Sequence, residues 1–355
     1  ILIPYGSCLK AKPIASLDTL AESRTNRAGQ NSVIVNGEGS DLSKKEALKR
    51  RAKRKTITQI MMLNLITIAQ ENGEPELEKS YWNTYYCQQN IVTADGKLYG
   101  KYCKNRFCTL CCANRKAEMI NKYYPIMKDR NEPYFLTLTV KSCKAHQLKG
   151  YISSMLKTFQ RIVEKHRKRN QRGSGLKLIG VKSLESNFNP KAKTYNPHFH
   201  IITKERWMAE VIKKEWVVRS KKGYAAYWCQ KITPITNLET GLIEIIKYGS
   251  KIFTEPDLKK KAKQTDTAHI YLKALDTILT AMKGKRIFDR FGFNSPNKNK
   301  PQHYPAKLLS DYREWEYDSE SSDWIDSVTG EVLTDYKIPS HLEAVLENNI
   351  DVLNK

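Results

Sequence analysis

The chain has 355 residues, which is enough for one large domain or two modest ones with cores of their own. It contains no apolar run of the roughly 18 to 20 residues that a membrane helix needs and no recognisable secretory signal. We therefore expect a cytoplasmic protein without a membrane partner. The formal net charge of +24 favours a polyanionic partner, with nucleic acid as the first choice.

The charge is unevenly distributed along the chain. Residues 311–355 hold twelve acidic and three basic residues, a net charge of −9, which leaves +33 for the first 310 residues. We interpret residues 311–355 as an acidic C-terminal tail on a basic body. Such a tail either screens the DNA-binding surface or binds a partner, or it is a solvated segment without a role.

The N-terminal part is predicted to be loosely ordered before its first helix. Residues 1–40 mix Gly, Ser, Asn and Pro without periodicity, whereas residues 42–69 follow a helical pattern with a very basic first half. That half contacts phosphates or forms a solvated helix face. We therefore expect residues 1–80 to be a basic, partly disordered region with one helix.

A cysteine-rich segment, 81–120, follows. In a chain that is expected to be cytoplasmic, clustered cysteines favour a metal site over disulfides. Cys103, Cys108 and Cys111, with Cys87 upstream, can supply four thiolates to a tetrahedral structural Zn²⁺. Cys112 is a spare ligand or replaces Cys111, and the alternative is a small core of free cysteines.

Basic and aromatic side chains alternate around these cysteines. Such a mixture suits contact with the DNA backbone and stacking on bases. We expect DNA contacts from three residues of this segment: Arg106, Arg115 and Lys116.

Residues 130–255 show the pattern of an α+β domain. In the segment 134–141, YFLTLTVK, apolar residues alternate with threonines, which predicts a strand with Leu136 and Leu138 facing the core. The expected order is β-α-β-β-α-β-α, which predicts a mixed or antiparallel sheet backed by helices. The expected elements cover residues 134–141, 147–169, 176–188, 197–202, 206–219, 228–235 and 241–253.

Two histidines lie in the predicted strand PHFHII, residues 197–202. Residues i and i+2 of a strand point to the same face, so His198 and His200 project side by side while Phe199 enters the opposite face. Two imidazoles can share one divalent cation, and an oxygen ligand shifts the preference toward Mg²⁺ or Mn²⁺. Glu185 supplies that oxygen if its strand pairs in the right register. Otherwise the two histidines are surface or hydrogen-bonded residues.

The segment 241–253, GLIEIIKYGSKIF, predicts a two-faced helix. On a helical wheel Glu244, Tyr248 and Lys251 share one polar face, opposite an apolar stripe. A phenol with a pKa of about 10 needs activation to act as a nucleophile. A metal on the phosphate, a nearby lysine and a carboxylate general base together suit phosphoryl transfer. The alternative is an exposed tyrosine in an ordinary surface ladder.

Together these motifs resemble those of a known family, the plasmid rolling-circle replication initiators (Rep proteins) of the HUH endonuclease superfamily. The match is to the type that pairs one Tyr with a Glu. The strand FLTLTV at 135–140, PHFHII at 197–202 and Glu244-x-x-x-Tyr248-x-x-Lys251 occur in the family's order, behind a similar cysteine cluster. The resemblance covers about residues 87–253. It implies an HUH-type core with a central antiparallel sheet backed by helices.

The resemblance also implies roles for single residues. His198 and His200 would bind the metal, and Tyr248 would attack the plasmid origin and become joined to the 5′ phosphate, releasing a 3′ hydroxyl that primes synthesis. Glu244 would activate water for termination, and Lys251 would assist at the phosphate. Only one Tyr occurs in the motif, which argues against the two-tyrosine replicases.

We therefore expect an endonuclease that nicks and rejoins single-stranded or cruciform origin DNA, with Mn²⁺ or Mg²⁺ at the nuclease site and a structural Zn²⁺. Host helicase and polymerase are the expected partners, and residues 256–310 are expected to form a basic helical extension. Two alternatives stay open. One is a transposase or relaxase with the same site, and the other is a non-catalytic, zinc-containing DNA-binding regulator.

Overall fold

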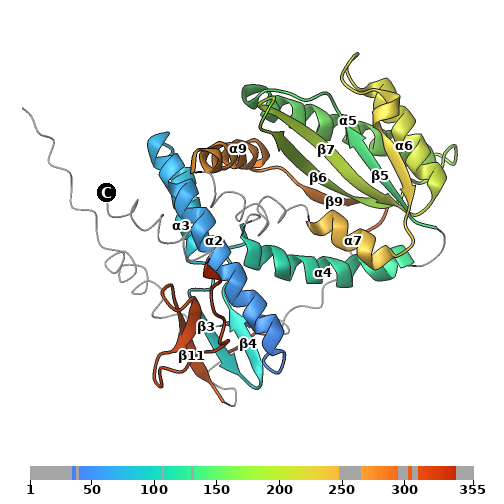
Figure 1. Ribbon diagram of the computed structural model, residues 1–355. Helices are drawn as coiled ribbons and strands as arrows, with labels where there is room; N and C mark the ends of the chain where they lie inside the picture. The colour runs from blue at the N-terminus through green and yellow to red at the C-terminus, as the bar shows by residue number, and fades with distance from the viewer. Residues whose placement is uncertain are drawn as a thin grey trace, which may run out of the picture.

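The computed structural model describes residues 34–36, 40–105, 108–128, 132–247, 265–294, 303–305 and 311–340. Two five-stranded antiparallel sheets, each flanked by helices, make up most of this part of the protein (Figure 1). A further pairing joins β1 (Ile34–Asn36) to β10 (His303–Pro305). The predicted α+β class with antiparallel sheets is confirmed. Among the described helices, none is long and apolar enough to cross a membrane.

The first sheet, here named the histidine sheet, has the strand order β8-β5-β7-β6-β9. Its helices α5 (Ala145–Gln171), α6 (Arg206–Arg219) and α7 (Leu238–Lys247) fall between the strands in the predicted order β-α-β-β-α-β-α. The last predicted helix is described only as far as Lys247. The strands are β5 (Tyr134–Thr139), β6 (Gly180–Asn189), β7 (Thr194–Thr203), β8 (Lys231–Pro234) and β9 (Phe288–Phe291).

The main hydrophobic core lies on one face of the histidine sheet. Leu136, Leu138 and Phe199 point into it, as their alternation with polar residues predicts, and meet Phe159 of α5 and Trp216 of α6. Thr137, Thr139, His198 and His200 occupy the opposite face, because side chains alternate along a strand.

Helices α4 (Thr109–Lys128) and α7 pack on that opposite face, as Figure 1 shows. Leu242 and Ile245 of α7 are fully buried against Val181 and Ile202, and Met127 of α4 joins the same cluster. The apolar stripe of α7 therefore faces the sheet, as the helical wheel predicts.

The expected boundary at residue 255 differs from the structure. Strand β9 pairs with β6 at the edge of the histidine sheet, and α9 (Thr265–Met282) adds Ile278 and Met282 to its core. The first sheet therefore extends to residue 294, into the expected helical extension. Gly292 ends β9 with φ +79°, where an added Cβ would lie 1.9 Å from the Leu178 carbonyl oxygen, so only glycine fits.

The second sheet, named the cysteine sheet, has the order β12-β11-β3-β4-β2. Its strands are β2 (Ser40–Asp41), β3 (Asn90–Ala94), β4 (Lys97–Gly100), β11 (Arg313–Asp318) and β12 (Asp323–Asp326). The expectation of an acidic tail from residue 311 is therefore wrong for residues 313–326. The hairpin of β11 and β12 buries three aromatic side chains next to acidic residues: Trp315, Tyr317 and Trp324. The acidic composition of the segment therefore did not indicate that one face of the hairpin is buried.

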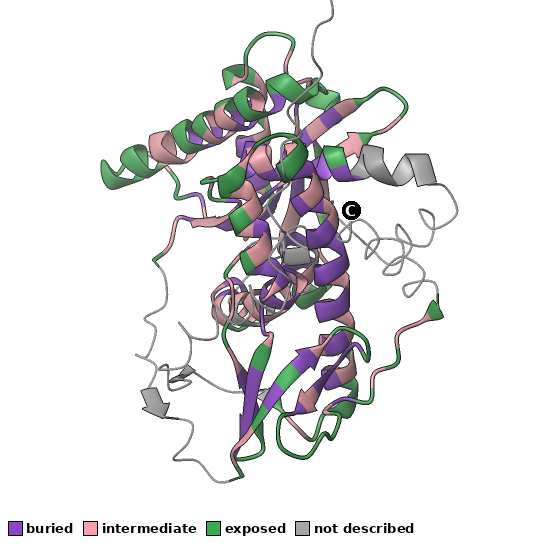
Figure 2. Cartoon of the chain, turned by 90° about the vertical axis from the view of Figure 1, so that its left-hand side faces the viewer, coloured by how far each residue is buried: buried purple, intermediate pink, exposed green. Residues whose placement is uncertain are grey.

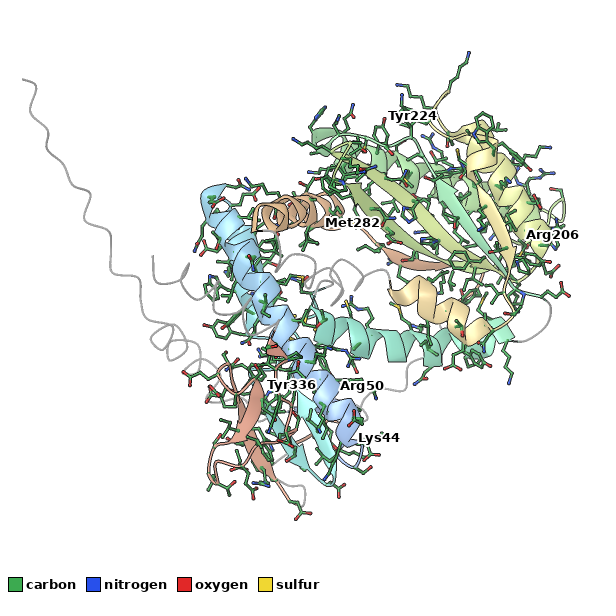
Figure 3. The ribbon with its side chains drawn as sticks, viewed as in Figure 1. Lys44, Arg50, Arg206, Tyr224, Met282 and Tyr336 are labelled. Atoms are coloured by element: carbon green, nitrogen blue, oxygen red, sulfur yellow. The ribbon has the colours of Figure 1, made fainter. Side chains whose placement is uncertain are left out.

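Helix α2 (Lys45–Glu71) confirms the predicted N-terminal helix, and α3 (Pro75–Tyr85) follows it. Buried residues occupy most of α2 (Figure 2). Lys44 and Arg50 lie near its beginning, beside the cysteine sheet (Figure 3). Lys55 is fully buried, so the basic half of α2 is not a uniformly solvated face. Residues 1–33 of the expected N-terminal region lie outside the described residues.

Candidate metal centres and catalytic site

A histidine–glutamate cluster lies at the centre of the histidine sheet. Strand β6 pairs with β7 so that Glu185 stands directly opposite His198, and β5 places Thr137 opposite His200. Residues directly opposite one another in an antiparallel pair share a face. Glu185 Oε2 lies 3.2 Å from His198 Nε2 and 3.1 Å from His200 Nε2. The register that the sequence left open is thus the one that brings Glu185 to the two histidines.

The orientation of the His198 imidazole favours a cation at this point. His198 Nδ1 lies 2.9 Å from the carbonyl oxygen of Asn196, which accepts a hydrogen bond from it. In the neutral ring, Nε2 then carries a lone pair that faces the carboxylate, another acceptor. Only a proton or a bound cation between them relieves this conflict. Backbone carbonyls commonly orient ligating histidines in this way.

The carboxylate itself is held in the charged form. Burial alone raises the pKa of Glu185, but the hydrogen bonds and charges of His198 and His200 outweigh it and leave the pKa below its ordinary value. Two imidazole nitrogens and one carboxylate oxygen, all within 4.8 Å of one another, fit a divalent cation such as Mn²⁺. Three protein ligands leave further coordination positions for phosphate oxygens or water.

The tyrosine motif begins within helix α7. Glu244 belongs to this helix, but its side chain is outside the described part of the structure, as are Tyr248 and Lys251 entirely. Tyr248 comes directly after Lys247, at which the described helix ends. Because α7 packs on Ile202, two residues beyond His200, the helix lies on the sheet face that carries the histidines.

Four cysteines converge beside the cysteine sheet. The β3–β4 hairpin pairs Ile91 with Gly100, so the residues just before β3 lie next to those just after β4. Cys87 and Cys103 thereby become neighbours, and the start of α4 adds two more, Cys108 and Cys111. The Sγ atom of Cys111 lies 3.6 Å from that of Cys87 and 3.5 Å from that of Cys103, and all four ligand atoms lie within 4.8 Å.

The backbone around the cluster favours thiolates. The amide of Cys103 donates to Cys87 Sγ, that of Asn105 to Cys103 Sγ and that of Cys111 to Cys108 Sγ, each at 3.4 Å. Cys108 stands directly before α4, where the helix dipole stabilises negative charge. Hydrogen bonds among the sulfurs lower the pKa of Cys103 and raise those of Cys87 and Cys108. This arrangement suits a tetrahedral thiolate site for Zn²⁺.

Lys55 is a residue of this centre that the sequence analysis missed. Its Nζ donates to the Tyr85 carbonyl at 2.7 Å and lies 5.1 Å from the centre of the Tyr317 ring. Burial lowers the pKa of Lys55 to about 8, although the negative charges of the cysteines raise it. Lys55 stands at helical spacing from Ala52 and Gln59, which belong to the buried stripe of α2, and this spacing could have indicated from the sequence that Lys55 is buried.

The structure describes the three expected DNA-contacting residues to different extents. Arg115 lies on α4 and donates to the Lys104 carbonyl at 3.0 Å, which ties the helix to the turn after Cys103. Lys116 belongs to the same helix, but its side chain lies outside the described residues, and so does all of Arg106. The structure therefore gives Arg115 a bracing contact and leaves the DNA contacts of all three as expectations.

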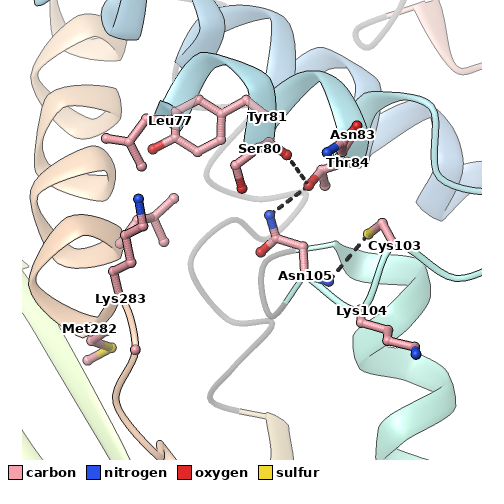
Figure 4. A pocket seen from close by; sticks show the side chains of 12 residues that line it. Leu77, Ser80, Tyr81, Asn83, Thr84, Cys103, Lys104, Asn105, Met282 and Lys283 are labelled. Atoms are coloured by element: carbon pink, nitrogen blue, oxygen red, sulfur yellow. Dashed lines mark hydrogen bonds between the residues drawn. The ribbon is translucent and has the colours of Figure 1, made fainter. Parts of the chain in front are cut away.

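A pocket of about 320 Å³ with a mixed polar and apolar lining lies between α3, the turn after Cys103 and the end of α9 (Figure 4). On its floor, the Asn105 side chain donates to Thr84 Oγ1 at 2.6 Å. Lys283 lines the opposite side. The pocket borders the cysteine cluster and includes none of the three residues of the histidine–glutamate cluster.

Comparisons with known proteins identify the family of the chain. Residues 97–300, more than half of the chain, match the model of the Rep_1 family, described as "Replication protein", and the chain belongs to this family. The resemblance to replication initiators is thereby confirmed. The matched segment ends beyond β9, which agrees with the wider extent of the histidine sheet.

Individual relatives carry the name "Protein rep". One from Staphylococcus aureus is 31% identical over 175 residues, which cover 44% of this chain and 72% of the relative. Another from Bacillus sp is 31% identical over 137 residues, 36% of this chain and 43% of the relative. A third, from Streptococcus pneumoniae, is 30% identical over 114 residues, 30% of this chain and 34% of the relative. No solved structure matches the chain.

Proposed function

We propose that this replication protein is an HUH-type endonuclease that nicks and rejoins a DNA strand at a plasmid origin, which starts rolling-circle replication. Tyr248 is the nucleophile, and a divalent cation, Mn²⁺ or Mg²⁺, is bound by His198, His200 and Glu185. The main support is the convergence of two Nε2 atoms and a carboxylate oxygen on the sheet face on which α7 packs.

The chemistry follows from these groups. The cation, when bound, polarises the scissile phosphate and balances its charge. The phenol oxygen of Tyr248 loses its proton and bonds to phosphorus. The bond from phosphorus to the 3′ oxygen breaks, and that oxygen takes up a proton. The protein is left joined to the 5′ phosphate, so the ester energy is conserved and the reverse reaction rejoins the strand.

Two further residues of the motif complete the cycle. Glu244 acts as general base on a water molecule at termination, which releases the protein by hydrolysis. Lys251 balances the phosphate charge. The 3′ hydroxyl released by nicking serves a host polymerase as primer, and a host helicase opens the duplex ahead of it. Arg106, Arg115 and Lys116 contact the DNA backbone.

A nicking assay tests this proposal. The full chain with Mn²⁺ is incubated with supercoiled plasmid that carries its origin, and the products are separated with and without protease. We expect open circles with protein covalently attached to a 5′ end, and none when Mn²⁺ and Mg²⁺ are left out. Specific binding of the origin without any nicking would overturn the proposal and indicate a non-catalytic DNA-binding regulator.

The cysteine cluster is part of the proposal as a structural Zn²⁺ site. Four thiolates around Zn²⁺ carry a net charge of −2, and a charge of that size next to a hydrophobic core needs a partner. Lys55 supplies a buried positive charge beside Cys87, Cys103 and Cys108. A closed site of four thiolates leaves no position for a substrate, so this metal has no catalytic part.

Replacement of Cys108 by serine is expected to remove the zinc and destabilise the protein. One ligand of four is lost, and a structural site contributes directly to the free energy of folding. We expect zinc content near zero by plasma emission spectroscopy and a Tm lower by roughly 3–5 °C, which corresponds to about 2 to 4 kcal/mol for a chain of this size. Cys112→Ser is the matched control, because Cys112 is not among the four converging sulfurs. Full zinc content in Cys108→Ser would contradict the assignment.

Replacement of Lys55 by methionine is expected to weaken zinc binding while the cysteines stay intact. Methionine keeps the apolar stem but removes the charge next to the thiolates. We expect the dissociation constant for Zn²⁺ to rise roughly tenfold, equivalent to about 1.4 kcal/mol, in competition with a chromogenic chelator. Lys45→Met, the same change at an exposed position of α2, should leave it unchanged. Equal affinity in both variants would exclude the counter-charge role.

A further inference from the structure

An aromatic turn stands at the entry to the edge strand of the histidine sheet. It comprises Tyr227 and Trp228 in the short 3-10 helix η1 (Tyr227–Cys229), directly before β8. The exposed fraction is 87% for Trp228 and 50% for Tyr227. One exposed apolar side chain is common in proteins, but two adjacent large aromatic rings in water are characteristic of a contact surface.

The aromatic turn is held firmly from both sides. Gln230 is buried, and its side chain accepts a hydrogen bond from the Thr139 amide at 2.7 Å and donates to the Ala226 carbonyl at 2.8 Å. Upstream, the ring of Tyr224 packs on that of Tyr151 at 4.7 Å. Figure 3 shows Tyr224 at the end of the histidine sheet that is remote from the cysteine sheet. The exposed rings are therefore presented in a preorganised position rather than on a loose loop.

The aromatic turn is connected to the histidine–glutamate cluster through β5. Gln230 binds both backbone groups of Thr139, and Thr139 stands opposite His198. One residue further on, the exposed Lys231 pairs with Thr137, which in turn pairs with His200. Because paired residues share a face, Lys231 and His200 lie in one row across the sheet, two strands apart.

The charge around the aromatic turn is strongly positive. Residues 213–231 contain six basic residues and one acidic residue. The acidic one, Glu215, is neutralised by ion pairs with Lys165 and Arg219. Lys213 Nζ lies 4.1 Å from the centre of the Tyr227 ring, so cation and aromatic face are directly associated.

Exposed rings among cations match one ligand class in particular. Single-stranded nucleic acid offers unpaired bases that stack on aromatic side chains and phosphates that bind lysine. In a duplex the base faces are already stacked on one another and are closed to Trp228. A protein partner would also need apolar area, but apart from the two rings residues 213–231 expose one large apolar side chain, Val218, against six basic residues.

We infer that Trp228 and Tyr227 form a stacking platform for single-stranded DNA and that Lys231 binds a phosphate between this platform and the histidine–glutamate cluster. The inference deepens the proposed function and rests on it for the reaction that follows. The platform would hold a base of the substrate strand so that a neighbouring phosphodiester reaches His198 and His200. Trp228 and Lys231 are positioning residues in this scheme.

Binding without cleavage tests the platform. A fluorescein-labelled oligonucleotide of twelve thymidines is titrated with the full chain in buffer without Mn²⁺ or Mg²⁺, with fluorescence anisotropy as the readout. Trp228→Ala is expected to raise Kd roughly tenfold, since one stacked base contributes about 1–3 kcal/mol, and Trp228→Phe should recover most of the affinity. Lys231→Ala should reduce the dependence of log Kd on log salt by about 0.7. Val328→Ala, at another exposed apolar side chain, is the control.

The outcomes separate the platform from the proposed function. If Trp228→Ala binds the oligonucleotide as tightly as the unchanged protein, the platform is wrong, whatever the nicking assay gives. If the affinity falls as expected but the unchanged protein never nicks DNA, the platform stands and the proposed reaction fails. An equal loss of affinity for duplex and single-stranded probes would overturn the stacking role. A thermal melt confirms that each variant is folded.

Discussion

Phenylalanine in place of Tyr248 is expected to abolish both nicking and the covalent protein–DNA adduct. The substitution keeps the ring and removes only the oxygen that would bond to phosphorus, so no alternative path of similar geometry remains. We expect at least a thousandfold loss in the rate of open-circle formation, because loss of a nucleophile removes the covalent step itself. Binding of the origin, measured by gel shift, should change less than twofold.

The control is chosen to separate chemistry from packing. Tyr134→Phe removes a phenol oxygen at the start of β5, on the sheet face opposite to the one on which α7 packs, and should nick normally. If Tyr248→Phe still gave an adduct, peptide mapping of the protein–DNA conjugate would identify the true nucleophile. That result would disprove the assignment of Tyr248 but leave the metal site untouched.

The second large effect is expected from the histidine–glutamate cluster. Alanine at His198 or His200 removes one of three ligands, so we expect weaker Mn²⁺ binding by one to two orders of magnitude and nicking reduced at least a thousandfold. Mn²⁺ binding is measured by electron paramagnetic resonance and nicking on origin plasmid. His146→Ala, at an exposed histidine of α5, should alter neither. Retained Mn²⁺ affinity in His198→Ala would contradict the metal site.

Glu185→Gln tests the same site through stability. In the metal-free protein His198 Nδ1 donates to the Asn196 carbonyl, so the lone pair of its neutral Nε2 faces the Glu185 carboxylate at 3.2 Å, which places acceptor against acceptor. A glutamine amide donates where the carboxylate cannot. We therefore expect a Tm without metal that is equal to or higher than that of the unchanged protein, and a much smaller rise in Tm when Mn²⁺ is added. A large fall in Tm without metal would show that Glu185 has a purely structural role.

Local patterns predicted much of the histidine sheet correctly. The alternation in YFLTLTVK gave the inward face of β5, and the spacing of apolar residues gave α5 and α7. These features depend on neighbours along the chain, because each side chain's direction follows from strand or helix geometry alone. For the same reason His198 and His200 were expected side by side, and they are.

Long-range pairing could not be predicted in the same way. The four residues of β9 carry too little pattern to be recognised, and they form a strand because β6 offers a free edge. In the cysteine sheet, Trp324 Nε1 donates to the Gln88 carbonyl at 2.9 Å, across more than two hundred residues. Nothing in the acidic composition of residues 311–355 indicates that contact.

The sequence by itself determined which residues are candidates for the site: two histidines on one strand face, four cysteines with zinc-like spacing, and a tyrosine motif that begins in an amphipathic helix. Only the tertiary structure decided which partners they meet. The β6–β7 register brings Glu185 to the histidines, since a shift of one residue would turn it to the other face. The packing of α2 likewise places Lys55 beside the cysteines. Register and packing arise from contacts between distant segments, and these are set by the whole fold.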